Sequence, residues 1–255
     1  MKFKTTHYHY DLLKDNERLS AFYEAIEEYG GKTQLAYDLG CGSGILSYFL
    51  ASKFDEIISI EIDSRFYDCA RYNLDDYDNV DVVNSDVLSY DFSKKADLIV
   101  CEMLDTALID EEELPVVNHA KKFLKEDGII IPKGVINQAE LVNMQMAHIH
   151  WDEGANYETF SDAISYMELD FLDDIDPDFE DILSFKVKKD GIINGIKLTT
   201  ITKLNDNLVC GPTPMLNPPL LIPLDEKIVK CNDLINVKLK YIMGEGIETI
   251  KTQYW

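Results

Sequence analysis

Short apolar runs alternate with amphipathic stretches over the first half of the chain, from about residue 33 to residue 132. The apolar runs predict strands over about residues 35–39, 57–62, 80–83, 98–101 and 129–131. The amphipathic stretches predict helices over about residues 45–54, 65–74 and 114–124, and residues 1–30 form a helical lead-in. Strands that alternate with helices indicate right-handed βαβ units. The fold class is therefore α/β, with a Rossmann-like, doubly wound parallel sheet.

The second half has the pattern of a β-rich domain. After Pro132, strands are predicted over about residues 141–150, 182–187, 193–201, 220–224 and 234–242, with turn signals between them. The acidic segment 173–181 is predicted to be a solvated loop. We therefore expect a first domain over residues 1–134 and a β-rich, substrate-side domain over residues 135–255.

Charge and cysteine content narrow the possible functions. The 255 residues carry 24 Lys and Arg against 47 Asp and Glu, a formal net charge of -23. A chain this acidic repels phosphate backbones and anionic lipids, so nucleic acid and membrane are disfavoured as partners. Five widely spaced cysteines form neither a disulfide framework nor a zinc pattern, and His148 and His150 lack a placed third ligand, so no metal is expected. With no signal-peptide pattern and no apolar run of about 18 residues, we expect a cytoplasmic protein.

The strongest chemical signal is a glycine-rich loop between the first strand and the first helix of the predicted sheet. It runs Asp38-Leu39-Gly40-Cys41-Gly42-Ser43-Gly44, and glycines let a backbone turn tightly and approach a ligand. Ile45 stands where a dinucleotide-binding loop needs a small residue, and no Gly-Lys-Ser/Thr follows as in a P-loop. Asp38 would repel a phosphate and attract a sulfonium or ammonium group.

Acidic residues after the next two strands extend this pattern. Glu61 ends the second strand, at the distance from the loop where an acidic residue binds ribose hydroxyls. Asp86, followed by Val87, comes after the third strand and can accept from an adenine amino group. The set fits an adenosine with a cationic, phosphate-free tail, which is S-adenosylmethionine. The alternative is a plain strand–helix turn with Glu61 and Asp86 as solvated ends.

These residues are embedded in motifs that resemble those of class I S-adenosylmethionine-dependent methyltransferases, and most of all the protein arginine methyltransferases. The matching segments are His9–Arg18, Cys101–Leu104 with Glu111 nine residues after Glu102, and Phe123–Pro132. The resemblance implies that Arg18 holds the methionine carboxylate, that His9 lines the cofactor site, and that Glu102 and Glu111 are the two active-site glutamates. It is dense over residues 9–134 and thinner over 135–255, where the family carries a β-barrel.

Two glutamates suit a guanidinium acceptor for a physical reason. A guanidinium is planar, permanently charged and carries its donors in a fork, so two carboxylates can orient one nitrogen toward a methyl donor. A protein side chain is therefore the expected substrate. Glu111 has a simpler reading, because residues 110–113 are also an ordinary acidic start to a helix.

The chain departs from the arginine methyltransferase pattern in three places. Met103-Leu104-Asp105-Thr106 replaces the family's Trp-Met-Gly-Tyr, and the Thr-His-Trp loop is missing near Pro214–Pro219. The family's dimerisation arm looks shortened or absent around residues 165–190. The acceptor and the oligomeric state therefore stay open. The alternatives are RNA or a small molecule as acceptor, and a cofactor-binding scaffold without catalysis.

Overall fold

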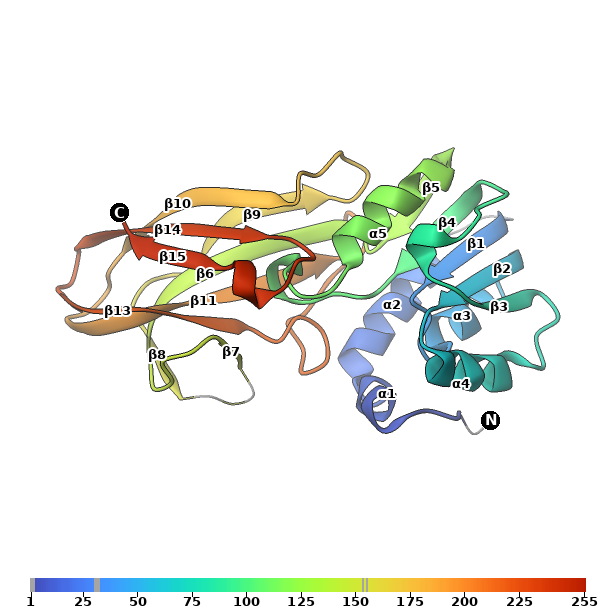
Figure 1. Cartoon of the computed structure of the whole chain (residues 1–255), viewed down its shortest axis with the longest axis horizontal. Helices are drawn as coiled ribbons and strands as arrows, with labels where there is room; N and C mark the ends of the chain where they lie inside the picture. The colour runs from blue at the N-terminus through green and yellow to red at the C-terminus, as the bar shows by residue number, and fades with distance from the viewer. Residues whose placement is uncertain (1–2, 30–32, 153, 155) are drawn as a thin grey trace.

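A computed structural model describes residues 3–29, 33–152, 154 and 156–255. Its first half is built on a parallel sheet of strand order β3-β2-β1-β4-β5 (Figure 1). The strands are β1 (Thr33–Leu39), β2 (Phe54–Glu61), β3 (Val80–Asn84), β4 (Ala96–Cys101) and β5 (Leu124–Ile131). All four neighbouring pairs are parallel, which confirms the predicted α/β class. The strand order reverses beside β1, and ligands bind at this position in open parallel sheets.

The helices agree with the predicted ones in place and differ in length. They are α1 (His7–Leu12), α2 (Asn16–Glu28), α3 (Ile45–Leu50), α4 (Ser64–Leu74) and α5 (Glu113–Ala120), with 3-10 turns η1 (Val87–Ser89), η2 (Thr106–Leu108) and η3 (Lys121–Phe123). The lead-in is two helices. Asp15 separates them, because its side chain accepts from the Arg18 amide at 3.0 Å and so caps the start of α2.

The second half is antiparallel and β-rich, as predicted. A seven-stranded sheet has the order β7-β13-β11-β6-β8 among β6 (Gly134–Met144), β7 (His150–Trp151), β8 (Tyr157–Thr159), β9 (Ile164–Asp170), β11 (Gly191–Lys203), β12 (Val209–Cys210) and β13 (Leu220–Val229), with β9 paired to β6 and β12 to β11. A three-stranded sheet joins β10 (Asp178–Lys186), β14 (Leu234–Ile242) and β15 (Lys251–Tyr254), and η4 (Ile247–Thr249) precedes β15.

Two sequence predictions in this half are wrong in detail. The strand over residues 141–150 ends at Met144, and His148 lies in the connection before β7, so His148 and His150 do not share one strand face. The acidic segment 173–181 is a loop only up to Pro177, because β10 begins at Asp178 and pairs with β14. The exposed aspartates of that strand hide its register in the sequence.

One hydrophobic cluster runs through both halves of the described chain, from Phe22 on α2 to Tyr241 on β14. Helices α1 and α2 lie where the two halves meet (Figure 1). Asp15 there accepts from the Thr213 hydroxyl and from the Met215 amide, both in the loop after β12. The division of the chain into domains at residues 134 and 135 stays a prediction. Among the described residues, no helix is long and apolar enough to cross a membrane.

The core of the parallel sheet predicts a stability difference between two leucines. Leu98 on β4 is 0 % exposed, and Leu98→Ala should lower the free energy of unfolding by about 2–5 kcal/mol because it removes buried methyl groups and leaves a cavity. The matched control is Leu234→Ala, at a side chain that is 75 % exposed, with an expected change within about 0.5 kcal/mol. Urea unfolding measures both, and equal losses would contradict this assignment of the core.

Candidate active site

The glycine-rich loop joins β1 to α3, and side chains from other segments pack tightly against it. Gly40 and Gly42 have φ of +68° and +56°. A Cβ on Gly40 would lie 2.6 Å from the Met103 sulfur, and one on Gly42 would lie 2.7 Å from Cε1 of His9. Both positions therefore need glycine for two reasons, the left-handed backbone and the neighbouring side chain.

Glu61 at the end of β2 holds this loop. Its two carboxylate oxygens accept from the Gly42 amide and from the Asp63 amide, each at 2.8 Å. Burial raises the pKa of Glu61, and the two amide donors oppose that shift. A carboxylate has about four acceptor positions, so Glu61 keeps capacity for ligand hydroxyls.

Asp38, the last residue but one of β1, makes the floor of the loop acidic. It is 1 % exposed and accepts from the Ser47 hydroxyl of α3 at 2.5 Å. Burial raises its pKa to about 7, against the opposing effect of the Ser47 hydrogen bonds, and the charges of Glu61 and Glu102 raise it further. Such a floor favours a cationic ligand and disfavours a phosphate.

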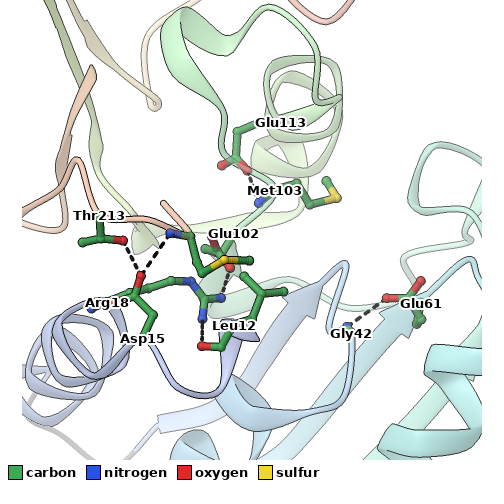
Figure 2. A network of polar contacts seen from close by, with 10 residues as sticks. Leu12, Asp15, Arg18, Gly42, Glu61, Glu102, Met103, Glu113 and Thr213 are labelled. Atoms are coloured by element: carbon green, nitrogen blue, oxygen red, sulfur yellow. Dashed lines mark hydrogen bonds and ion pairs between the residues drawn. The ribbon is translucent and has the colours of Figure 1, made fainter. Parts of the chain in front are cut away.

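An ion pair between Arg18 and Glu102 crosses the site above this floor (Figure 2). Arg18 comes from the first turn of α2 and Glu102 follows β4, so the pair joins the helical lead-in to the parallel sheet. Their side chains are 4 % and 10 % exposed. Arg18 also donates to the Leu12 carbonyl at 3.3 Å, which ties the end of α1 to the pair.

A small cleft of about 70 Å³ lies among these groups, lined in part by His9, Arg18, Asp38, Gly42 and Glu102. His9 covers it from α1, and its ring stacks on Phe66 with a centroid distance of 3.9 Å. Burial, and next the Arg18 charge, lower the pKa of His9. Small-molecule sites usually measure about 300–1,000 Å³, so this cleft is smaller than a nucleoside site.

The other residues predicted to bind the cofactor lie outside the lining of this cleft. Asp86 accepts from the Leu88 amide at 2.8 Å and caps η1, and Val87 is buried. Both follow β3, beside the end of β2 that carries Glu61. The space next to Gly44 is filled by Leu74 of α4. These residues have local structural partners, and their cofactor contacts stay predictions.

A second, larger cavity of about 780 Å³ lies between the β4–α5 connection and the loop after β12. Glu111, Asp110 and Asp105 line one side. The other side carries apolar residues, namely Trp151, Pro212, Pro214, Met215, Pro218 and Pro219. The loop that stands where the sequence analysis sought Thr-His-Trp thus faces this cavity. Glu102 lines the small cleft and Glu111 the large cavity. Desolvation first, and then the charges of Asp110 and Glu102, raise the pKa of Glu111, so the two glutamates interact electrostatically.

Glu113 and Asp105 are two further buried acids, and the sequence does not predict their burial. Glu113, the first residue of α5, is 0 % exposed and accepts from the Met103 amide at 2.8 Å (Figure 2). Burial raises its pKa to about 8, and the Glu102 charge adds to this. Residues 110–113 look like a solvated acidic helix start in sequence, so only the fold distinguishes the buried glutamate from its neighbours.

The buried acids predict that the protein loses stability between about pH 5 and pH 8. The folded-state pKa of Glu113 lies at about 8, above the ordinary 4.5, so between these values the folded protein binds a proton that the unfolded chain releases. Stability therefore falls as pH rises through this window and levels off above about 8. Asp38 and Asp105, both near 7, contribute with the same sign up to about pH 7.

Glu113→Gln should flatten this pH dependence, because the neutral amide imitates the protonated acid. Thermal unfolding followed from pH 5 to pH 9 measures the slope, with Glu112→Gln at the exposed neighbour as control. Identical slopes for wild type and Glu113→Gln would show that Glu113 titrates normally.

The chain is similar in sequence to a methyltransferase domain and to two full-length relatives. Residues 36–128 match the family model of a methyltransferase domain. An uncharacterized protein of Methanothermobacter thermautotrophicus is 44% identical over 98% of this chain and 98% of its own length, and one of Methanocaldococcus jannaschii is 38% identical with the same coverage.

Partial matches carry functional names. The ribosomal protein L11 methyltransferase of Thermoanaerobacter pseudethanolicus is 36% identical over 44% of this chain and 36% of its own length. Protein arginine N-methyltransferase 7 of Drosophila virilis is 30% identical over 54% of this chain and 22% of its own length.

Solved structures extend the likeness of the fold to more than nine tenths of the chain. A chain of the Trypanosoma brucei PRMT1 enzyme–prozyme complex superposes with a TM-score of 0.78 at 16% identity, over 91% of this chain and 86% of that chain. Arabidopsis thaliana protein arginine methyltransferase 10 also gives 0.78, at 15% identity over 92% and 88%. The chain therefore belongs to one family with the two full-length relatives, and it is a class I S-adenosylmethionine-dependent methyltransferase that resembles the protein arginine methyltransferases.

Proposed function

We propose that this protein transfers a methyl group from S-adenosylmethionine to a side-chain nitrogen of a protein, and that the acceptor is an arginine guanidinium. The observation that carries the proposal is the placement of two glutamates between two cavities. Glu102 lines the cleft beside the glycine loop, and Glu111 lines the larger cavity, within electrostatic reach of Glu102.

The residues around the glycine loop suit the cofactor. S-adenosylmethionine supplies a methyl group bonded to a positively charged sulfur. Asp38 lines the cleft, and Glu61 accepts from the Gly42 amide in its wall, so both place negative charge near such a cation. Gly40 and Gly42 let the backbone approach a ligand. Arg18 supplies the cation that would pair with a carboxylate.

The remaining cofactor contacts follow the order of the strands. In this proposal Glu61 receives the ribose hydroxyls, Asp86 receives the adenine amino group beside Val87, and His9 closes α1 over the cleft. Gly44 is the N-cap of α3 and lies against α4.

The two glutamates would bind and orient the acceptor. A guanidinium that enters from the larger cavity meets Glu111 first and Glu102 at the cofactor cleft. Both can hold it by charge-assisted hydrogen bonds, so one nitrogen faces the cofactor cleft. The same carboxylates stabilise the positive charge that the acceptor carries during transfer.

A protein substrate is favoured by the larger cavity. Its volume of about 780 Å³ exceeds what one guanidinium needs, and its prolines, Met215 and Trp151 offer contacts to neighbouring residues of a polypeptide. The net charge of -23 opposes RNA. Two relatives that match over part of this chain are named for methylation of proteins. RNA or a small molecule as acceptor, and a scaffold without catalysis, are the alternatives.

Methyl-labelled S-adenosylmethionine and extract from the source cells test this function. We expect label in the protein fraction and on arginine, with a loss of about 100-fold in rate for Glu102→Gln because an oriented carboxylate is removed. Glu112→Gln is the matched control on the exposed side of the same connection. Label in RNA or metabolites would overturn the acceptor, and no label despite cofactor binding would leave the scaffold.

The glycine loop gives a separate prediction for cofactor affinity. Gly42→Ala should weaken binding of S-adenosylhomocysteine at least tenfold, because the new methyl group strikes His9 and the backbone has a φ of +56°. Gly154→Ala is the control: its φ is +90°, yet a Cβ there meets nothing within 4 Å. Titration calorimetry measures both affinities, and equal losses would show that the clash with His9 is irrelevant.

A further inference from the structure

We propose that Asp105 is a positioning residue: it holds the turn that presents Glu111 to the larger cavity, and this inference rests on the proposed function of Glu111. Asp105 lies between the two glutamates, in the connection from β4 to α5. It is 6 % exposed. It stands where the arginine methyltransferases have a glycine in their Trp-Met-Gly-Tyr loop.

The carboxylate of Asp105 accepts hydrogen bonds from three consecutive backbone amides. Oδ2 accepts from Ile109 at 3.2 Å and from Asp110 at 3.0 Å, and Oδ1 accepts from Glu111 at 3.2 Å. The last of these contacts is to the backbone of Glu111 itself. Asp105 therefore sets the position from which the Glu111 side chain starts.

The turn from Asp105 to Glu111 is not favoured by the local conformational preferences of its residues. Ala107 and Leu108 have φ of 62° and 59°, and two successive non-glycine residues in the left-handed region cost conformational energy. Both are completely buried. Such a backbone conformation persists only where surrounding contacts stabilise it. The three hydrogen bonds to Asp105 are such contacts, and they lie within the connection itself.

The β-rich half holds the same turn from outside. The Thr106 hydroxyl donates to the Pro218 carbonyl at 2.8 Å, and the Ala107 amide donates to the Thr200 hydroxyl of β11 at 2.7 Å. The carbonyls of Leu108 and Ile109 accept from Gly244 and Gly246, each at 2.8 Å, after β14. The turn is thus held by hydrogen bonds from two sides, from Asp105 within the connection and from the β-rich half.

Charge makes Asp105 more than a space-filling group. Asp110 and Glu111 on its own turn are negative, and Tyr241 faces it from β14. Burial raises the pKa of Asp105 to about 7; the backbone amides of Asp110 and Glu111 oppose this shift, and the charges of these two residues add to it. An asparagine has nearly the same shape, but it has one accepting oxygen instead of two. Its NH2 group would face backbone N–H donors on the other side, so it cannot keep all three bonds.

Asp105→Asn therefore tests whether Asp105 positions Glu111, without a change in side-chain volume. The readout is the single-turnover rate of methyl transfer to the labelled protein acceptor at saturating cofactor. We expect a loss of about 100-fold, the usual effect of misplacing a reacting group by about 1 Å, with S-adenosylhomocysteine affinity unchanged within about twofold. Asp176→Asn is the matched control, since Asp176 also accepts a backbone amide in a turn, in the β9–β10 connection.

A double-mutant cycle separates positioning from general damage. If Asp105 acts through Glu111, Asp105→Asn should lower the rate less than twofold in a Glu111→Gln background. A loss of about 100-fold in both backgrounds, or full activity of the single variant, would overturn the inference.

Amide hydrogen exchange provides a readout that does not need activity. In Asp105→Asn, the amides of Ile109, Asp110 and Glu111 should exchange faster, while the core of β4 stays protected. If wild type methylates no acceptor, the proposed function fails on that result. Amide hydrogen exchange then decides whether Asp105 holds the turn, and unchanged protection of the three amides would overturn this role.

Discussion

A buried ion pair between Arg18 and Glu102 is the interaction on which the rest of the site depends. A buried charge without its partner is strongly destabilising, so Arg18 and Glu102 each need the other where no ligand replaces it. The pair also fixes geometry. It draws the start of α2 and the end of α1 over the carboxyl ends of the parallel strands, and it holds Glu102 beside the glycine loop.

The pair lies within an unusual concentration of buried acid. The buried carboxyl groups of Asp38, Glu61, Asp105 and Glu113 all have raised pKa values, mainly because of burial. Self-repulsion of this kind lowers stability, and a site that binds cations recovers part of that free energy when they arrive. The same charges that would attract the proposed sulfonium and guanidinium groups therefore make the free protein less stable. Activity and stability are set against each other by the same carboxylates.

The sequence predicts the parallel sheet and the position of the glycine loop between β1 and α3, because both are local patterns. Strands such as β4 are continuous apolar runs, and the glycine loop has its own short motif. The edge strands β8 and β15 were missed, since their residues are largely polar and gain order only from a neighbouring strand. Asp105 and Glu113 were missed for a related reason. The burial of these two residues comes from segments that are distant in sequence, and the residues around them in the chain carry no sign of it.

The antiparallel half has a structural part in the site, because it holds the connection after β4 that carries Glu111. A parallel sheet alone brings Glu102 to the glycine loop, because both follow neighbouring strands, β4 and β1. It does not determine where the connection after β4 goes. Contacts from β11, from the loop after β12 and from the segment after β14 fix that connection. The distance between the two glutamates is therefore set across both halves of the chain, so a change in the β-rich half can alter transfer without touching the cofactor cleft.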